Sequence, residues 1–243
     1  MTKNWFIDWF ASDFYQTVYN HRNISDANKL IDLIISKTEL KQNYWVLDAA
    51  CGFGRHSQIF ADKSMNVVGF DLSKTLLLRA KENLIDFNNA FLLRADIRNV
   101  CFKNKFDLIS NLFTSFGYFE SDEENFSFIK NSTKFLKKDG FFVFDYFNQF
   151  YLEKKLIPSS EREVNGIRIS EKREIKNKRI VKEIIIQNSK TDKFYESVKL
   201  YSKDEIINHF GNFGYKPRFI FGDYDGNNFD EELSERLVIF FTL

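Results

Sequence analysis

The segment from residue 45 to residue 56 restricts the fold more than any other part of this chain. A short apolar run over residues 45–47 predicts a strand that ends at Asp48, followed by a turn of small residues and the start of a helix. Gly52 and Gly54 let the backbone of the turn approach a ligand closely, and the helix N-terminus beyond them offers unpaired N–H groups. This strand–turn–helix unit predicts an α/β fold with a ligand at the turn.

The same alternation of strand and helix continues to residue 144. Further strands are expected at 67–70, 90–93, 106–109 and 140–144, with helices at 73–87 and 123–136. Ser73 is the expected N-cap of the first of these helices, and Gly140 is the expected left-handed residue that closes the second. The alternation predicts a parallel sheet covered by helices on both faces, with its ligand crevice beyond the carboxyl ends of the strands.

The two segments that flank this core have a different pattern of apolar residues. Residues 1–44 carry apolar and aromatic side chains at three- and four-residue spacings, which predicts helices. Residues 163–200 alternate like a β-ribbon, and a helix from Ser202 to about residue 213 and a strand pair at 219–221 and 237–242 follow it. The ribbon region 153–193 holds 12 Lys and Arg against 7 Asp and Glu. We interpret this basic run as a solvated face, with contact to an anionic substrate as the alternative.

Composition excludes several classes of protein. The net charge of +1 argues against a protein built to grip a polyanion, so no nucleic-acid partner is expected. The sequence has no apolar run of membrane-spanning length, and its N-terminus lacks the layout of a signal peptide. Two cysteines cannot form a disulfide framework, so a cytoplasmic protein without a membrane partner is expected.

Charge at the glycine turn discriminates between two nucleoside cofactors. Asp71 lies 19 positions past Gly52, where a carboxylate could accept both ribose hydroxyls of an adenosine. A dinucleotide fingerprint would need glycine or alanine at the sixth position from Gly52, and Ser57 stands there. Asp48, expected at the mouth of the turn, disfavours a pyrophosphate but suits the ammonium and sulfonium of S-adenosylmethionine. The residues therefore favour S-adenosylmethionine over NAD.

Five blocks of sequence resemble the motifs of class I S-adenosylmethionine-dependent methyltransferases. They are 48–54 (motif I, with Ala50 for the usual first glycine), 68–73, 94–97, 106–113 and 136–142, in the family's order. The resemblance implies a doubly wound, seven-stranded, mostly parallel sheet. In the third block it places Asp96 at the adenine amino group.

The flanks resemble small-molecule members of that family, such as sugar N-methyltransferases and relatives of glycine N-methyltransferase. This resemblance implies one domain over 1–243, with a helical lid at 1–44, an α/β core at 45–150 and 201–243, and an antiparallel β-ribbon insert at 151–200. Tyr15, Tyr19 and Arg22 would then reach the methionine end of the cofactor. The cofactor-binding set predicted in full is Tyr15, Tyr19, Arg22, Asp48, Ala50, Gly52, Gly54, Arg55, Asp71, Leu72, Ala95, Asp96, Ile97, Asn111 and Leu112.

The predicted activity is methyl transfer from S-adenosylmethionine to a small acceptor (an amine, a sugar or a carboxylate), which leaves S-adenosylhomocysteine. Phe116, Tyr118 and Tyr146 are candidates for the acceptor site. No residue is assigned as a general base: His56 is expected to pack or cap, and His21, which is better placed beside Arg22, is expected to be a surface residue. The sequence shows no metal-ligand spacing. A methyltransferase acting on RNA or protein, a non-catalytic cofactor-binding protein and, more weakly, an NAD-dependent oxidoreductase are the alternatives. Whether the chain forms a homodimer is left open.

Overall fold

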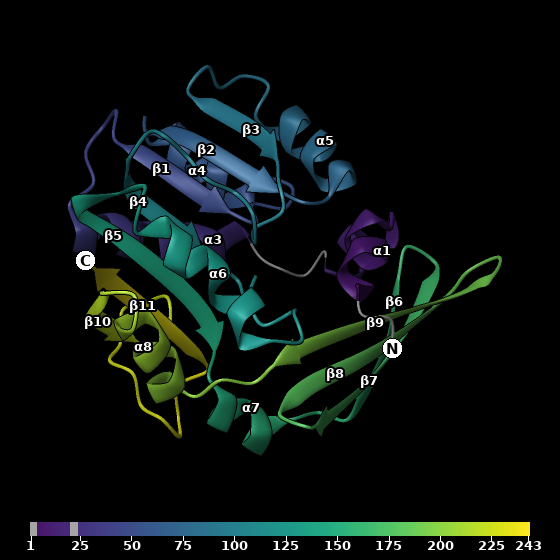
Figure 1. The fold of residues 1–243 in the computed structure, drawn as a ribbon. Coiled ribbons are helices and arrows are strands. Elements are labelled where there is room, and N and C mark those ends of the chain that lie inside the picture. Colours follow the sequence, from purple (N-terminus) through teal and green to yellow (C-terminus); the bar gives the residue numbers. More distant parts are fainter. Residues whose placement is uncertain (1–3, 20–23) are drawn as a thin grey trace.

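A computed structural model describes residues 4–19 and 24–243 of the chain. Its centre is a seven-stranded sheet in the order β10-β11-β5-β4-β1-β2-β3 (Figure 1). The strands are β1 (Trp45–Ala49), β2 (Asn66–Asp71), β3 (Ala90–Arg94), β4 (Phe106–Asn111), β5 (Leu136–Phe147), β10 (Lys216–Phe221) and β11 (Arg236–Thr242). Strand β1 pairs in parallel with both β2 and β4, whereas β11 runs antiparallel to β5 and β10. The prediction of a seven-stranded, mostly parallel sheet is confirmed. The strand order reverses at β1, which is where such sheets bind ligands.

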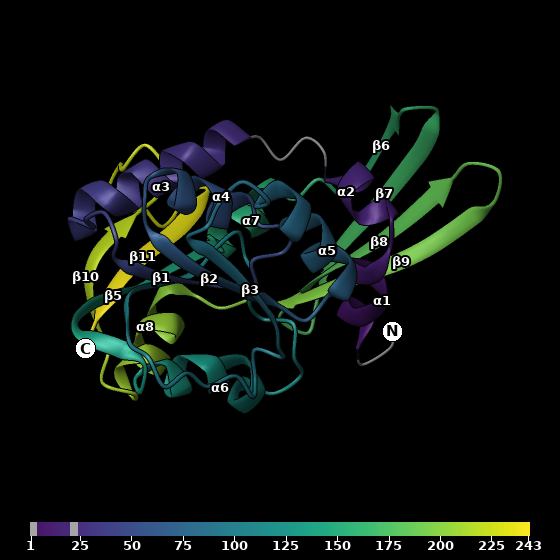
Figure 2. The ribbon, with the colours of Figure 1, turned by 90° about the horizontal axis from the view of Figure 1, so that it is seen from above.

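Helices cover both faces of this sheet (Figure 2). On one face, α3 (Ile24–Thr38) and α4 (Arg55–Asp62) share a buried cluster with strand side chains such as Val46. On the other, α6 (Asp122–Ser132) and α8 (Lys203–Gly211) share a second cluster that includes Phe142. Helix α5 (Lys74–Asn83) follows β2, and the N-caps of α5 and α8 are the serines expected from the sequence, Ser73 and Ser202. Each crossover brings the chain back to begin the next parallel strand from the same edge of the sheet. The carboxyl ends of the parallel strands therefore lie together at the opposite edge.

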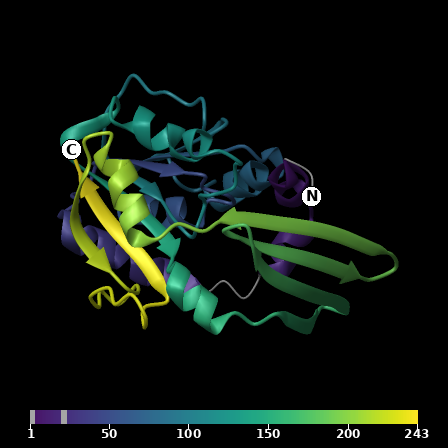
Figure 3. The same ribbon diagram turned by 60° about the horizontal axis from the view of Figure 1, so that its bottom comes forward.

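A second, four-stranded antiparallel sheet projects from the first (Figure 3). It consists of β6 (Ser159–Val164), β7 (Ile167–Lys176), β8 (Arg179–Gln187) and β9 (Thr191–Lys199), and α7 (Gln149–Lys155) leads into it from β5. It packs against α1 (Trp5–Ala11) and α2 (Phe14–Val18) through a cluster that joins Ile169, Ile184 and Ile186 to residues of the two helices. The predicted antiparallel ribbon is therefore confirmed.

The basic residues of this second sheet are largely used in ion pairs within it. Arg162, Arg173 and Lys182 surround the buried Glu171. Two further pairs join Arg168 to Glu161 and Lys193 to Glu183. This pairing favours the interpretation of the basic run as a structural and solvated face over contact with an anionic substrate.

Three expectations about local structure are corrected. Helix α6 ends at Ser132 and β5 already begins at Leu136, so residues 137–140 are strand rather than a helix-closing turn. Gly140 does not have positive φ, and its missing side chain instead gives clearance, because a Cβ there would lie 2.9 Å from the Asp107 carbonyl oxygen. The segment 1–44 is not one lid, since α3 packs on the sheet in the core cluster of α4. In the described residues no helix is long and apolar enough to cross a membrane.

Candidate functional site

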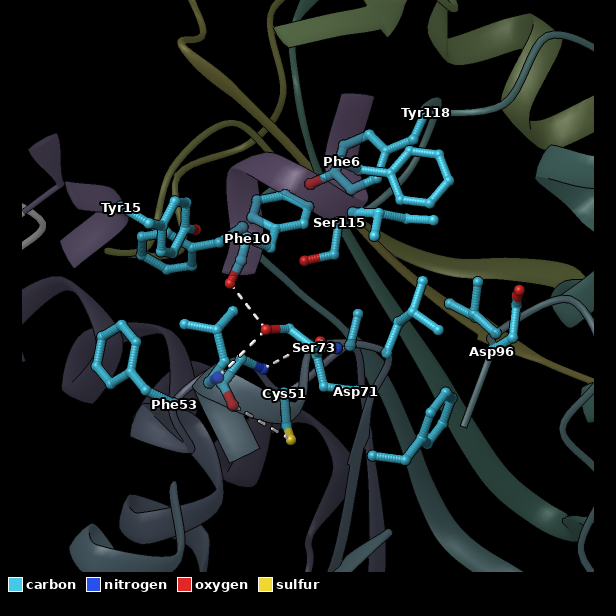
Figure 4. Close-up of a pocket in the computed structure, with 18 of the residues that line it drawn as sticks. Phe6, Phe10, Tyr15, Cys51, Phe53, Asp71, Ser73, Asp96, Ser115 and Tyr118 are labelled. Atoms are coloured by element: carbon cyan, nitrogen blue, oxygen red, sulfur yellow. Dashed lines mark hydrogen bonds between the residues drawn. The ribbon is translucent and has the colours of Figure 1, made fainter. Parts of the chain in front are cut away.

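A cavity of about 320 Å³ lies beyond the carboxyl ends of β1, β2 and β4. This volume is within the range of roughly 300–1,000 Å³ that is common for small-molecule sites. We call the segments 50–53, 71–73 and 95–97 the floor of the cavity. We call the lid helices α1 and α2, together with the loop 115–119 that follows β4, its roof. The roof and floor face each other across the cavity in Figure 4.

Asp71 holds the floor together. Its two carboxylate oxygens accept hydrogen bonds from the backbone N–H groups of Gly52 at 2.9 Å and of Ser73 at 2.8 Å. Burial raises the pKa of this carboxyl group, and the two backbone hydrogen bonds offset part of that shift. A carboxylate has about four acceptor positions, so two remain for hydroxyl groups of a ligand in the cavity.

The glycine turn leaves room directly beside Asp71. Gly52 has φ of +58°, and a Cβ built there would meet no atom within 4 Å. A side chain at this position would therefore be strained and would fill the cavity. Gly54 has a different role: it is the N-cap of α4 at φ of +80°, and its bare Cα packs on Ala80. Gly52 lines the cavity and Gly54 does not.

Asp48 is not at the mouth of the turn, which corrects the expectation from the sequence. Its side chain is 1% exposed, lies behind the turn and accepts a 2.6 Å hydrogen bond from the Ser57 hydroxyl. Burial raises the pKa of Asp48 to about 6, against hydrogen bonds from Ser57 and Ser110 that lower it. Asp48 does not line the cavity, and its hydrogen bond to Ser57 supports the turn from behind. The dinucleotide pattern would have a glycine where Ser57 stands. Ser57 fits here because Gly69 of β2, which lies against it, has no side chain, and a Cβ on Gly69 would crowd the Ser57 hydroxyl oxygen.

The third floor segment, 95–97, lines the cavity with Asp96 facing it (Figure 4). Arg98 forms a bidentate pair with Asp96, the shortest contact being 2.6 Å, and also contacts Glu124 at 2.8 Å. Hydrogen bonds from Arg98 lower the pKa of Asp96 despite partial burial. Asp96 is therefore ionised at neutral pH and can accept a hydrogen bond from an amino group.

The roof is aromatic. Tyr118 packs against Trp5, Phe6 and Phe10 of α1, with ring centroids 5.2, 6.4 and 5.7 Å away. Phe119 completes the group by contacting Phe6 at 5.5 Å. Aromatic faces attract cations, by about 0.5–2 kcal/mol per contact. This roof is thus suited to a ligand that carries a sulfonium or an ammonium.

The lid is fastened to both of its neighbours. On the side of the core, the Ser73 hydroxyl donates to the carbonyl oxygen of Phe10 at 2.8 Å while it caps α5 (Figure 4). On the side of the second sheet, the Trp9 indole N–H donates to Glu196 at 2.6 Å, and the Tyr19 hydroxyl donates to the same carboxylate. Arg162 adds a hydrogen bond to the Val18 carbonyl at 2.6 Å.

The structure brings most of the predicted site residues to this one cavity. Those that line it are Tyr15, Tyr19, Ala50, Gly52, Arg55, Asp71, Leu72, Ala95, Asp96, Ile97, Leu112, Phe116 and Tyr118. Arg22 and the neighbouring His21 lie outside the described residues.

Two more predicted residues, Asn111 and Tyr146, lie behind the wall rather than in it. Asn111 is 1% exposed, and its side-chain amide donates to the carbonyls of Ala49 and Ser115, which ties the turn to the loop. Tyr146 is fully buried, and its hydroxyl donates to the Lys199 carbonyl, so it is not an acceptor-site residue. Phe116 lines the cavity with one side but packs mainly in the core, against Phe144 and others.

Several lining residues were not predicted from the sequence. The lid contributes Phe6 and Phe10, α5 contributes Lys74 and Thr75, and α6 contributes Asn125. The aromatic spacing of the lid was the only signal for the first two, and nothing local marks the others. His56 also lines the cavity; burial, and secondarily Arg55, lower the pKa of its imidazole well below the usual value, so it is neutral. Within residues 4–19 and 24–243, no group of three or more His, Cys, Asp or Glu could hold a metal ion.

These residues fit S-adenosylmethionine. Asp71 has acceptor positions for ribose hydroxyls, Asp96 can receive an amino group, and Gly52 leaves open space where a side chain would stand. The aromatic roof supplies faces for a sulfonium.

Comparison with known proteins agrees with this assignment. Residues 46–140 match the family described as "Methyltransferase domain". The chain is 29% identical over 135 residues to a dTDP-3-amino-3,4,6-trideoxy-alpha-D-glucopyranose N,N-dimethyltransferase of Streptomyces venezuelae, covering 54% of this chain and 55% of that protein. The chain thus spans about half the length of the first curated relatives it matches.

Solved structures share the fold over nearly the whole chain. An S-adenosylmethionine-dependent methyltransferase from Clostridium acetobutylicum superposes with a TM-score of 0.83 at 18% identity, covering 97% of this chain and 98% of that one. CalS10, an amino pentose methyltransferase from Micromonospora echinaspora solved with S-adenosylmethionine bound, gives a TM-score of 0.70 at 18% identity, covering 95% and 97%.

Proposed function

We propose that this chain, whose residues 46–140 match the family described as "Methyltransferase domain", transfers a methyl group from S-adenosylmethionine to a small-molecule acceptor. The observation that carries the proposal is the position of Asp71. This buried carboxylate fixes the glycine turn through the Gly52 N–H and lines a cavity with an aromatic roof. A floor for an adenosine and a roof for a sulfonium are thereby combined in one cavity.

Each part of the floor has a proposed role. Asp71 would hold the ribose, Asp96 the adenine amino group, and Ala50 and Gly52 would allow the amino-acid end to lie against the turn. Tyr15, Tyr19 and Arg55 would border that end. When bound, the cofactor supplies a methyl group on an electrophilic sulfonium and leaves as S-adenosylhomocysteine. The chain's own residues would orient the acceptor in line with that methyl and exclude water, which is the main requirement of a displacement reaction.

The acceptor is proposed to be an amine, a sugar or a carboxylate that reacts in its unprotonated form. Apart from Asp71 and Asp96, no carboxylate among the described residues lines the cavity. Ser115, Tyr118 and Asn125 remain as neutral hydrogen-bonding groups on the roof side. An amino sugar fits this wall best, because aromatic faces pack against a sugar ring while neutral groups bond its hydroxyls. The similarity to an amino-sugar N,N-dimethyltransferase supports the same class.

The alternatives receive no support from the site. A non-catalytic binding protein was expected to fill the methyl site with side chains, whereas one cavity here reaches from Asp71 to Ser115 and Tyr118. A methyltransferase for RNA or protein was expected to show an open basic groove, whereas the lid covers this cavity (Figure 4).

Two measurements test the proposal. Calorimetry should show binding of S-adenosylmethionine and none of NAD; binding of NAD alone would refute the assignment of the cofactor. The protein should then be incubated with methyl-labelled S-adenosylmethionine and either a metabolite extract or the relative's amino sugar, dTDP-3-amino-3,4,6-trideoxy-glucopyranose. We expect mass spectrometry to show one small molecule that gains a labelled methyl group, together with S-adenosylhomocysteine. Labelling confined to RNA or protein would contradict the proposed acceptor class.

The proposal extends to the setting of the reaction. A cytoplasmic site of action agrees with two free cysteines, Cys51 and Cys101. The division into lid, α/β core and inserted ribbon is proposed as one functional unit, with the lid reduced to α1 and α2. Light scattering coupled to gel filtration would decide whether the chain forms a homodimer.

A further inference from the structure

One arginine of the second sheet holds three consecutive carbonyl groups of the roof loop. The guanidinium of Arg179, at the start of β8, donates to the carbonyl oxygens of Gly117 at 3.2 Å, Tyr118 at 3.1 Å and Phe119 at 3.1 Å. Its remaining bonds go to Ser197 of β9, with the Nε bonded to the hydroxyl at 2.7 Å and an Nη to the carbonyl at 2.8 Å. Arg179 itself does not line the cavity.

This guanidinium is used as a hydrogen-bonding fork and not as half of an ion pair. Across the part of the chain that the structure describes, no carboxylate lies within 4.0 Å of Arg179. The planar guanidinium spreads its donors over three nitrogens, and one Nη shares its two N–H groups among the carbonyls of Gly117, Tyr118 and Ser197. A lysine ammonium has three donors on a single atom and cannot span these acceptors. The residue type is therefore matched to the geometry of the loop.

The loop also lies directly against the neighbouring strand. The Lys199 N–H of β9 donates to the Gly117 carbonyl at 2.8 Å, and a Cβ on Gly117 would come within 3.0 Å of the Lys199 carbonyl oxygen. The other end of the loop is held by Asn125, whose side chain forms hydrogen bonds with both the N–H and the carbonyl of Phe119. Arg179 thus bonds both ends of this segment, which Lys199 and Asn125 also hold, and it bonds Tyr118 between them.

We propose that Arg179 is a positioning residue for methyl transfer, which sets the distance between the aromatic roof loop and the cofactor floor. The inference rests on the proposed function and deepens it, because it assigns the second sheet a part in fixing the acceptor wall. Tyr118 and Phe119 line the cavity, while the three carbonyls at Arg179 decide where their backbone lies. A displacement of about 1 Å at such a wall can reduce the rate on the order of 100-fold.

The test compares R179K and R179A with R168A. Arg168 is a matched control, because it is an exposed arginine of the same sheet and pairs only with surface groups. Hydrogen exchange is followed at the Phe119 and Lys199 amides, which report whether the loop stays on Asn125 and β9. We expect exchange at both amides to become about tenfold faster in R179A and to be intermediate in R179K. It should remain unchanged in R168A.

Two solution measurements separate positioning from a general loss of structure. The dissociation constant for S-adenosylmethionine should rise by no more than a few-fold in R179A and R179K, because the floor is untouched and only the aromatic roof loop is displaced, and it should not change in R168A. With dTDP-3-amino-3,4,6-trideoxy-glucopyranose as the probe, kcat/KM should fall on the order of 100-fold in R179A, less in R179K, and not at all in R168A. Exchange at both amides that is unchanged in R179A would overturn the inference whatever the activity. If the wild-type protein methylates no small molecule, the proposed function fails, while the exchange data still decide whether Arg179 positions the loop.

Discussion

The floor and the roof of the cavity are held in different ways. Asp71 in the floor bonds Gly52, 19 positions away, and Ser73, 2 positions away, and both partners are backbone groups. The roof depends on side chains from a separate sheet: Trp9 reaches Glu196 over 187 positions, and Tyr118 is bonded by Arg179 over 61. The floor is therefore fixed by the strand ends themselves. The roof is instead fixed by contacts with the lid helices and the second sheet.

The largest expected effect lies beneath the floor, at Asp48. Its folded-state pKa of about 6 exceeds the ordinary value of 3.8, so between these pH values the native state holds more protons than the unfolded state. Its contribution to stability falls as the pH rises from about 4 to 6 and stays low above that. Across this range the difference in unfolding free energy between D48N and wild type should shift by about 3 kcal/mol in favour of D48N. Urea unfolding at pH 4, 5, 6 and 7 measures this. If the difference in unfolding free energy between D48N and wild type does not depend on pH, the pKa of Asp48 is not raised in the folded state.

The second prediction concerns cofactor binding by the floor. In D71N an amide N–H₂ would face one of the two backbone N–H donors, and a charged acceptor would be lost from the cavity. Each hydrogen bond to a charged group contributes about 1.5–3 kcal/mol, so the dissociation constant for S-adenosylmethionine should rise on the order of 100-fold. Calorimetry measures the change. D86N, which removes an exposed aspartate beyond α5, is the control and should leave the dissociation constant unchanged. An equal loss of affinity in D71N and D86N would contradict a specific role of Asp71 in cofactor binding.

A smaller effect is expected where the roof meets the second sheet. E196Q keeps the shape of the side chain but removes the charge that accepts from Trp9 and Tyr19 and pairs with Lys182. We expect the unfolding free energy to fall by about 1–2 kcal/mol, with faster hydrogen exchange in α1 and α2. E183Q is the control on the same sheet, because Glu183 pairs with Lys193 at the surface. Unchanged exchange in the lid of E196Q would mean that the apolar cluster alone holds the roof.

The smallest effect separates two serines with the same local role. Ser73 and Ser121 both cap a helix by accepting a backbone N–H, but only Ser73 also bonds the lid at Phe10. S73A and S121A should each lose about 1 kcal/mol of stability from the cap. S73A should in addition weaken cofactor binding a few-fold and speed exchange in α1. If the two variants behave alike, the lid does not depend on its bond to the core.

Much of the floor could be predicted from sequence because its signals are local. The glycine turn, Asp71 and Asp96 each follow directly after a strand, and parallel strand ends meet at one edge. The exceptions have identifiable causes. Asp48 was placed in the cavity because the turn alone does not reveal that Ser57 draws the carboxylate behind it. Tyr146 was placed in the acceptor site because the sequence does not reveal its hydrogen bond to Lys199. That bond joins β5 to the end of the inserted sheet and draws the side chain away from the cavity.

By itself the sequence determined the α/β class and the strand ends that hold the floor, since alternation of strand and helix and the turn chemistry depend on residues close together along the chain. The charge argument for the cofactor depended on Asp48 at the mouth of the turn, and the tertiary structure places Asp48 behind the turn. The tertiary structure decided which aromatic residues form the roof, which of the apparent site residues lie behind the wall, and that Arg179 and Glu196 fasten the roof from the second sheet. The bonds from Arg179 and Glu196 to the roof join segments sixty or more positions apart, and the bond that places Tyr146 behind the wall spans 53 positions. A single sequence carries no periodic or motif signal for such contacts.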